Sequence, residues 1–214
     1  MSHFVILLGG DLSPTPRLRD QVAGARAIAA DSGIRHAEAL GLDPELWTGD
    51  FDSVDEGLRG RFERIPTEIF PAEKDMTDGE IAVEAALARG ATSLVLAGAF
   101  GGRRADHAFL HLAAAIRLAE GGMPVVLSSG DQEGRPLLTG DAAFDFPDGT
   151  LFSILGFTPL TGLTVRGAKW PLDGAAVPFG SSLTISNEVR GALSITLGEG
   201  RALLVAHFAE PAGA

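Results

Sequence analysis

The feature that most constrains the fold is a change of pattern near residue 130. Over the first 130 or so residues, short apolar runs alternate with stretches of helical periodicity. This alternation favours an open, mostly parallel sheet with helices on its faces. From about residue 131 onward, short runs rich in leucine and β-branched residues are separated by glycine, proline and aspartate, which is typical of antiparallel strands. We therefore predict an α/β domain over residues 1–130, followed by an all-β sandwich over residues 131–214.

Individual elements follow from the apolar runs and from the residues that end them. Strands of the first domain are predicted at residues 3–8, 25–30, 46–48, 65–70, 93–97 and 123–128. Helical periodicity predicts helices over residues 34–40, 77–89 and 105–120, each followed by a glycine that suits a helix C-terminus. The second domain is expected to contain strands at residues 151–155, 160–165, 183–185, 192–197 and 202–208.

The composition excludes several classes of protein. The chain has 214 residues, a formal net charge of −11 and no cysteine. An acidic surface repels nucleic-acid backbones and gains little from anionic membranes. Without cysteine there are no disulfides or thiolate metal sites, so a bound metal must use oxygen or imidazole ligands. The apolar runs are too short to span a bilayer and the first residues show no signal-peptide pattern, so we expect a cytoplasmic protein.

Acidic side chains follow several predicted strands of the first domain. Asp11, Asp31, Asp50 and Asp52 each come after an apolar run. In open α/β sheets, ligands bind beyond the carboxyl ends of the strands, so these carboxylates are expected to meet on one rim. Clustered carboxylates repel one another unless a cation compensates them. Such a rim, in a chain with no cysteine and few histidines, suits Mg²⁺ better than zinc.

The segment from residue 49 to 53, Gly-Asp-Phe-Asp-Ser, is the most specific of these motifs. In an extended chain, Asp50 and Asp52 would point the same way and could reach one metal ion or two bridged ions. Phe51 would then point into the core. The structural alternative is that Ser53 starts a capping box and the aspartates only precede a helix. That alternative leaves Asp50 unexplained.

The segment from residue 74 to 80, Lys-Asp-Met-Thr-Asp-Gly-Glu, leads into the predicted helix that starts near residue 77. Thr77 and Glu80 have the spacing of a capping box, and we favour that structural role for both. Asp78 falls in the first turn, where a carboxylate interacts favourably with the helix dipole. Lys74 gains nothing from the dipole, so a phosphate contact is the better interpretation.

The loop after the fifth predicted strand is rich in glycine. Glycines between a strand and a helix N-terminus can form a phosphate cradle from backbone N–H groups, although this loop matches neither a Walker A loop nor a dinucleotide-binding fingerprint. Arg103 could hold phosphate oxygens through two hydrogen bonds. Asp106 fits equally a helix cap, a partner of an arginine or a site residue. His107 and His111 lie four residues apart, but that spacing alone does not predict a metal site.

Two segments of the second domain carry candidate ligand contacts. Trp170 lies in a loop after Lys169, and Ser186, Asn187 and Glu188 follow a predicted strand. Trp170 is either a core residue or a stacking platform for a flat, cationic ring.

Taken together, these motifs resemble the thiamine pyrophosphokinase family. The matching stretches are residues 29–33, 49–53, 74–78, 101–103, 106–107 and 186–188. They occur in the family's order and cover nearly the whole chain. The resemblance implies that residues 1–130 form a nucleotide-binding catalytic domain and that residues 131–214 form a thiamine-binding β-sandwich.

The resemblance also implies a reaction and roles for individual residues. The reaction would transfer pyrophosphate from ATP to the hydroxyl of thiamine, with Mg²⁺ as cofactor and AMP as the second product. The implied metal ligands are Asp31, Asp50, Asp52 and Asp78, of which the last three are the candidate catalytic residues. The implied ATP contacts are Asp31, Lys74, Asp75, Thr77, Gly101, Gly102 and Arg103. The implied thiamine contacts are Trp170, Ser186 and Asn187. The family is homodimeric, which implies a site where the α/β domain of one subunit meets the β domain of the other.

Two other functions stay open. Mg²⁺-dependent phosphohydrolases also carry an Asp-x-Asp pair after a strand, but those with an aspartyl nucleophile place it after the first strand, whereas here it follows the third. A non-catalytic nucleotide or thiamine sensor would bind ligand without turnover. Binding alone does not need so many uncompensated carboxylates.

Overall fold

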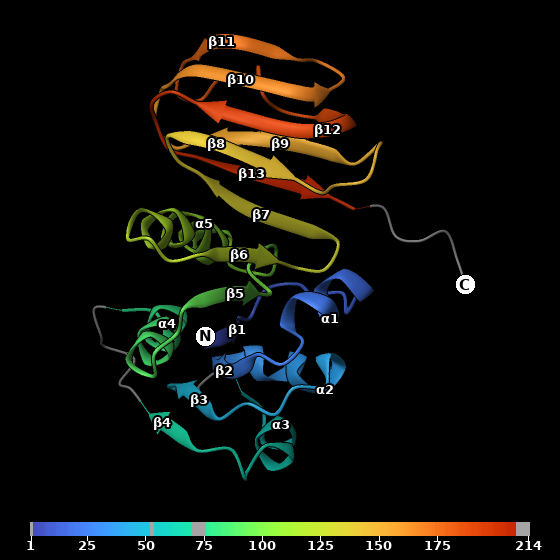
Figure 1. The fold of residues 1–214 in the computed structure, drawn as a ribbon. Helices are drawn as coiled ribbons and strands as arrows, with labels where there is room; N and C mark the ends of the chain where they lie inside the picture. The colour runs from blue at the N-terminus through green and yellow to red at the C-terminus, as the bar shows by residue number, and fades with distance from the viewer. Residues whose placement is uncertain (1, 52–53, 70–75, 209–214) are drawn as a thin grey trace. The chain divides into compact units, whose positions relative to one another are not determined.

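The computed structural model describes residues 2–51, 54–69 and 76–208 of the chain (Figure 1). The chain separates into two compact units. Unit 1 comprises residues 1–111 and 123–130, and unit 2 comprises residues 112–122 and 131–214. Within the described ranges, no helix is long and apolar enough to cross a membrane. The mixed α/β architecture expected from the sequence is confirmed.

Parallel strands form the centre of unit 1. They are β1 (His3–Leu7), β2 (Arg26–Ala30), β3 (Leu46–Gly49), β4 (Thr67–Ile69), β5 (Ser93–Ala97) and β6 (Val125–Ser128). Their order across the sheet is β6-β5-β1-β2-β3-β4, and each neighbouring pair is parallel. The chain builds outward from β1 to β4 and then returns to the other side of β1. The strand order therefore reverses between β1 and β5, and open α/β sheets bind ligands at such a switch point.

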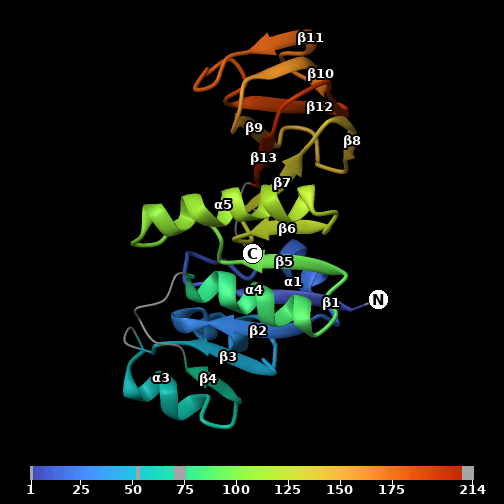
Figure 2. The same ribbon diagram turned by 90° about the vertical axis from the view of Figure 1, so that its left-hand side faces the viewer.

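Helices cover both faces of this sheet. In unit 1 they are α1 (Pro16–Val22), the 3₁₀ helix η1 (Asp31–His36), α2 (Ala37–Leu40), α3 (Glu56–Arg61) and α4 (Asp78–Ala88). Figures 1 and 2 show α4 on one face and α1 with α2 on the other. The predicted helix at residues 34–40 is therefore only partly right, because a 3₁₀ helix occupies its first half. Helix α5 (Ala105–Glu120) is divided between the units, since residues 105–111 belong to unit 1 and residues 112–120 to unit 2.

An aromatic cluster in the core of unit 1 holds the end of β3. Trp47 is 1% exposed. Its ring packs edge-on against Phe51 at 4.8 Å between centroids and against Phe62 at 6.4 Å. Because these rings interlock, the chain that leaves β3 is anchored in the core where the candidate aspartates begin.

Antiparallel strands build unit 2. They are β7 (Gln132–Leu137), β8 (Gly140–Phe144), β9 (Leu151–Gly156), β10 (Leu160–Ala168), β11 (Leu172–Val177), β12 (Asn187–Leu197) and β13 (Ala202–His207). Their order is β11-β10-β12-β9-β13-β7, and β8 also pairs with β12. The first residues of β12 pair with β9, and its later residues pair with β10 and β8. An apolar core that includes Phe152, Leu163, Leu193 and Leu204 lies among these strands.

The strand predicted at residues 183–185 is wrong. This segment is a turn in which Leu183 and Ile185 are exposed and Thr184 is buried. The Thr184 hydroxyl donates a hydrogen bond to the carbonyl oxygen of Ile154 at 2.6 Å, so the buried member of the triplet is the polar one. The short run of leucine and β-branched residues that predicted a strand is instead a turn that the Thr184 side chain holds against β9.

Several short elements gave no recognisable signal in the sequence. Strands β7, β8 and β11 contain glycine, proline or aspartate and lack a run of β-branched residues. Helices α1 and α3 are too short for a visible helical period and are set by their caps, Thr15 and Asp55.

Candidate functional site

Two loops lie side by side at the switch point, one after β1 and one after β5. Backbone hydrogen bonds run from the N–H of Gly10 to the carbonyl of Gly98 at 3.0 Å and from the N–H of Asp11 to the carbonyl of Phe100 at 2.9 Å. These bonds continue the parallel pairing of the two strands beyond their ends. The position where ligands bind in such sheets is therefore bordered by two mutually bonded loops.

The close approach of these loops depends on glycine. A Cβ atom on Gly10 would lie 2.4 Å from the carbonyl oxygens of Gly98 and Phe100, which is a clash with backbone that cannot move aside. Gly101 and Gly102 have φ angles of 64° and 84°, in the left-handed region that other residues rarely adopt. The glycines that the sequence singled out are thus required by the backbone itself.

The predicted phosphate cradle is partly engaged by the protein. The backbone N–H of Gly102 donates to Oδ2 of Asp11 at 2.9 Å. The same carboxylate oxygen would lie 2.3 Å from a Cβ on Gly101. Arg103 is exposed and forms no ion pair with any residue that the structure describes. A phosphate could therefore reach the Arg103 guanidinium directly, whereas it would have to displace Asp11 to reach the Gly102 N–H.

Asp31 and Asp50 follow neighbouring strands. Asp31 lies at the start of η1 with a φ angle of 45°, and its backbone carbonyl accepts a hydrogen bond from Nε1 of Trp47 at 2.8 Å. A Cβ on Gly49 would lie 3.3 Å from the Cα of Asp31, so the ends of β2 and β3 touch here. No motif of the sequence assigns Trp47 more than a structural role. Its indole N–H in fact holds the backbone of a candidate metal ligand.

The predicted extended course of residues 49–53 is wrong at Phe51. Its φ angle is 63°, so the chain turns left-handed at this residue. The turn keeps the ring of Phe51 buried against Trp47, and the predicted core role of Phe51 is confirmed. Asp52 lies outside the described residues. The structure therefore does not support the argument that an extended chain aligns Asp50 with Asp52.

The structural alternative for this segment is also wrong. Helix α3 begins at Glu56, and its N-cap is Asp55, whose carboxylate accepts a hydrogen bond from the N–H of Leu58 at 2.8 Å. A capping box started by Ser53, which lies outside the described residues, would have to begin the helix two residues earlier. Helix capping therefore does not account for Asp50.

The capping box predicted at the start of α4 is confirmed. Oγ1 of Thr77 accepts a hydrogen bond from the N–H of Glu80 at 3.3 Å, and Oε2 of Glu80 accepts one from the N–H of Thr77 at 3.1 Å. Asp78 is the first residue of the helix. The side chain of Thr77 is thus engaged in the cap, and its ATP contact stays a prediction. Lys74 and Asp75 lie outside the described residues.

The predicted metal ligands can be placed only in part. Asp31, Asp50 and Asp78 lie at the end of β2, at the end of β3 and in the first turn of α4, while Asp52 lies outside the described residues. Within residues 2–51, 54–69 and 76–208, no three His, Asp or Glu side chains are grouped so that they could hold a metal ion. The described carboxylates offer the oxygen donors that Mg²⁺ prefers, and Gly49 gives Asp31 and Asp50 adjacent backbones.

Asp106 is the partner of an arginine, one of the three roles that the sequence left open. Arg104 donates from Nε to Oδ1 of Asp106 at 3.0 Å and from Nη2 to Oδ2 at 2.6 Å. These hydrogen bonds hold the pKa of the Asp106 carboxyl well below its usual value. Of the two neighbouring arginines, Arg104 thus forms a surface ion pair with Asp106, and Arg103 is the one open to a ligand.

His111 has a structural position beside α4. Its Nδ1 lies 3.3 Å from the carbonyl oxygen of Ala99, a contact in which the ring nitrogen must donate. A Cβ on Gly79 would lie 3.4 Å from its Nε2, so the ring packs against the first turn of α4. Burial lowers the pKa of His111, which favours the neutral ring. With His107 it forms no group of metal-binding side chains among the described residues.

Trp170 is not a core residue of unit 2. Its side chain is 55% exposed, so the stacking interpretation is the one that its position allows. Nζ of Lys169 lies 4.7 Å from the centroid of the Trp170 ring and 3.4 Å from Oε2 of Glu188. The ring thus has a cation on one side, and that cation has a carboxylate partner.

Asn187 holds the backbone of Trp170. Its amide group is buried, with 8% of the residue exposed. Oδ1 accepts a hydrogen bond from the N–H of Trp170 at 3.1 Å, and Nδ2 donates to the Trp170 carbonyl at 2.8 Å. Oδ1 also accepts a bond from the N–H of Glu188 at 2.8 Å. These bonds give Asn187 a positioning role that its sequence pattern did not indicate, while its predicted substrate contact stays a prediction.

Ser186, the other predicted contact on this segment, precedes Asn187 with a φ angle of 61°. Its backbone N–H donates to Oγ of Ser153 at 3.0 Å. The left-handed conformation and this bond fix the turn that leads into β12, and the substrate contact of the Ser186 side chain stays a prediction.

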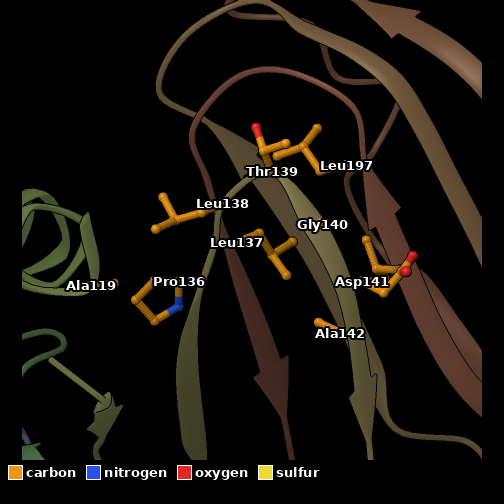
Figure 3. Close-up of a pocket in the computed structure, with 10 residues that line it drawn as sticks. Ala119, Pro136, Leu137, Leu138, Thr139, Gly140, Asp141, Ala142 and Leu197 are labelled. Carbon is orange, nitrogen blue, oxygen red and sulfur yellow. The ribbon is translucent and has the colours of Figure 1, made fainter. Parts of the chain in front are cut away.

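A pocket of about 230 Å³ in unit 2 lies elsewhere (Figure 3). It is lined by apolar side chains such as Pro136, Leu137 and Leu197, and by Asp141. The Asp141 carboxylate accepts a hydrogen bond from the Thr196 hydroxyl at 2.5 Å. The pocket contains none of the predicted site residues, and we assign it no role.

Comparison with known protein families gives two matches in chain order. Residues 23–127 match the model described as "Thiamin pyrophosphokinase, catalytic domain". Residues 143–201 match the model described as "Thiamin pyrophosphokinase, vitamin B1 binding domain". The two matches lie on either side of the change of pattern near residue 130.

Individual relatives carry the same name. The chain is 29% identical over 180 residues to the thiamine pyrophosphokinase of Bacillus subtilis (strain 168), covering 80% of this chain and 83% of that protein. A solved structure of the Bacillus subtilis protein has a TM-score of 0.85 at 24% identity, over 98% of this chain and 100% of that one. The Geobacillus thermodenitrificans structure has a TM-score of 0.78 at 25% identity, over 99% of each chain.

Proposed function

The chain belongs to the thiamine pyrophosphokinase family, and from that premise we propose that it transfers pyrophosphate from ATP to the hydroxyl of thiamine, giving thiamine diphosphate and AMP. The observation that carries this function is the presence of both family models in one chain, the catalytic one over residues 23–127 and the vitamin-binding one over residues 143–201. A protein that only hydrolysed nucleotides would have no need of a vitamin-binding domain.

Each reactant is assigned to one region of the chain. Residues 1–130 would bind the nucleotide, because the switch point between β1 and β5 and its glycine loops lie there. Residues 131–214 would form a β-sandwich that binds thiamine. The sandwich is supported by β12, which pairs first with β9 and then with β10 and β8 around an apolar core.

The ATP phosphates would be contacted by Arg103 and Lys74, with Asp75, Thr77 and the Gly101–Gly102 backbone close to them. Arg103 is supported by its exposure and by the lack of an ion pair with the described residues. Arginine suits this task because its planar guanidinium can donate two hydrogen bonds to one phosphate.

Mg²⁺ would be held by Asp31, Asp50, Asp52 and Asp78. The donor chemistry fits, because carboxylate oxygens are its preferred protein ligands and the backbones of Asp31 and Gly49 already touch. When bound, the ion would neutralise charge on the transferred phosphates.

The protein's own contribution would be positioning. Pyrophosphoryl transfer needs the thiamine hydroxyl in line with the β-phosphorus and AMP as the leaving group, so groups that orient the two substrates supply much of the acceleration. On the nucleotide side these groups would be the glycine loops and Arg103. On the thiamine side they would be Trp170, Ser186 and Asn187, with the Trp170 ring as the stacking surface.

We further propose that the enzyme is a homodimer in which one subunit's α/β domain meets the partner's β domain at the site, and that it works in the cytoplasm. The exposed Trp170 ring supports a shared site, since a stacking residue left open in one chain is available to ligand and partner together. Analytical ultracentrifugation tests the oligomeric state, and a purely monomeric active enzyme would rule out the shared site.

One coupled assay tests the proposed reaction. AMP release is followed with MgATP, with and without thiamine. Thiamine-dependent AMP is the expected result, whereas phosphate release that ignores thiamine would indicate the phosphohydrolase and binding without turnover would indicate the sensor. Asp50→Asn should lower turnover by orders of magnitude with the fold intact, and Asp43→Asn, at an exposed aspartate of unit 1, serves as the matched control.

A further inference from the structure

Arg35 is a residue of the nucleotide-binding rim that no sequence pattern singled out. It lies in η1, four residues after Asp31, and its side chain is exposed. Its Nη2 group donates to the carbonyl oxygen of Gly9 at 2.7 Å and to that of Gly10 at 2.9 Å. One end of the guanidinium is therefore fixed to the loop after β1.

The rest of the Arg35 guanidinium has no protein partner within the described ranges. No carboxylate of residues 2–51, 54–69 or 76–208 forms an ion pair with it, and its two hydrogen bonds use Nη2 alone. An arginine has five N–H donors, so those on Nε and Nη1 remain available to an anion.

The carbonyls that hold Arg35 are those against which the glycine loop packs. A Cβ on Gly102 would lie 3.2 Å from the Cα of Gly10 and 3.7 Å from the carbonyl oxygen of Gly9. The Arg35 guanidinium therefore lies at the switch point, next to the turn that leads into Arg103. Arg103 itself is the residue after Gly102, so its backbone leaves the same loop.

His36 supports the same arrangement without adding charge. Its Nε2 donates to the carbonyl of Gly10 at 3.0 Å, so this oxygen accepts hydrogen bonds from both Arg35 and His36. Burial first, and then the charge of Arg35, lower the pKa of His36, which favours the neutral ring. Arg35 thus supplies the positive charge of this pair, and His36 helps to hold the loop to which Arg35 is attached.

We infer that Arg35 is a second phosphate-binding arginine of the nucleotide site, contacting the polyphosphate of ATP together with Arg103. The inference rests on the nucleotide binding at this rim, as proposed above. A guanidinium that is already tethered loses less freedom when it binds phosphate than a mobile one does. In a chain with a net charge of −11, a cation at the rim also offsets the repulsion that a polyphosphate meets on approach.

The variant Arg35→Gln removes the positive charge of Arg35 and keeps a side chain that can bond to the Gly9 and Gly10 carbonyls. A glutamine amide can still donate hydrogen bonds to the loop carbonyls, but it carries no charge for a phosphate. Loss of a charged hydrogen bond should raise the KM for MgATP about tenfold or more and leave the KM for thiamine unchanged. Arg35→Lys keeps the charge without the planar fork and should give an intermediate KM for MgATP. The matched control is Arg19→Gln, since Arg19 is also exposed and donates to a backbone carbonyl, that of Pro14 at 3.3 Å.

Direct titration completes the test. MgATP and AMP are titrated calorimetrically into wild type, Arg35→Gln and Arg19→Gln after thermal unfolding has shown that all three are folded. A larger loss of affinity for MgATP than for AMP, seen in Arg35→Gln alone, is the expected result. If Arg35→Gln fails to fold, the same comparison is made with Arg35→Lys.

Two results would overturn the inference while leaving the proposed reaction intact. The first is thiamine-dependent AMP formation by Arg35→Gln with an unchanged KM for MgATP. The second is normal MgATP binding by Arg35→Gln and impaired binding by Arg35→Ala, which would reduce Arg35 to a positioning residue for the loop. Absence of thiamine-dependent AMP in the wild type would instead refute the proposed reaction, and the MgATP titration would still decide the role of Arg35.

Discussion

Replacing Asn187 with alanine would remove the side chain that holds the loop carrying Trp170. The two bonds to the Trp170 backbone, at 3.1 Å and 2.8 Å, would be lost together with the bond to the N–H of Glu188 at 2.8 Å. Alanine cannot replace any of them, and the side chain they come from is buried. The expected consequence is a loop that no longer holds the exposed ring in one position.

The expected loss of thiamine affinity follows from the two hydrogen bonds that hold the Trp170 backbone. Each is worth about 1 kcal/mol net, so the ordered loop loses about 2 kcal/mol relative to disordered alternatives. Because every 1.4 kcal/mol is a factor of ten, thiamine binding should weaken by up to about thirtyfold if only the ordered loop binds it. The KM for MgATP should be unchanged, since the change lies outside the proposed nucleotide-binding region.

The assay is AMP release with thiamine titrated at saturating MgATP, then with MgATP titrated at saturating thiamine. Thr196→Val is the matched control, because it removes a side-chain hydrogen bond on the same strand, to Asp141 at 2.5 Å, with no contact to Trp170. Both variants should lose thermal stability, and Asn187→Ala alone should lose thiamine affinity. A normal KM for thiamine in a destabilised Asn187→Ala would refute the positioning role.

Three further predictions concern unit 1. Gly10→Ala places a Cβ 2.4 Å from two loop carbonyl oxygens, so the free energy of unfolding measured in urea should fall by about 1–3 kcal/mol. Unchanged stability would contradict the close approach of the loops. Trp47→Phe keeps a buried ring but leaves the Asp31 carbonyl without its 2.8 Å donor. We expect the free energy of unfolding to fall by about 1–3 kcal/mol and the turnover to fall as well. Normal turnover would show that the indole N–H does not position Asp31. Burial lowers the pKa of His36 below its ordinary 6.5, so its contribution to stability is present above that pH and is lost as the pH falls through the folded-state pKa. The urea midpoint, measured from neutral pH downward, should therefore fall less steeply in His36→Gln than in the wild type. An equal slope in both proteins would refute this.

Much of the fold could be predicted from the sequence because its signals are local. Strand β5 and helix α5 lie at the predicted residues, since each is a strongly apolar or periodic run with clear stops. The capping box of Thr77 and Glu80 depends only on residues three apart. Where the local signal was ambiguous, as at residues 183–185, a tertiary contact between Thr184 and Ile154 produced a turn instead of the predicted strand.

The sequence names the candidate site residues as a prediction, and their geometry was less accessible from it. The aspartates and glycines follow predicted strands in the sequence, and from that alone we expect them on one rim. The left-handed turn at Phe51 was not predictable, because it arises from packing of that ring against Trp47. Arg35 was missed for the same kind of reason, since its partners are backbone carbonyls of Gly9 and Gly10, which leave no pattern in the sequence.

The sequence by itself determined the strongly apolar or periodic elements such as β5 and α5, the capping box of α4 and the family that the motifs resemble, because each of these depends on neighbours within a few positions. Only the tertiary structure decided what those residues touch. Asp11 meets the N–H of Gly102 across 91 positions, and Asn187 meets Trp170 across 17. Such contacts depend on the order in which strands join their sheets, and that order is set by packing of the whole chain rather than by any local run of residues.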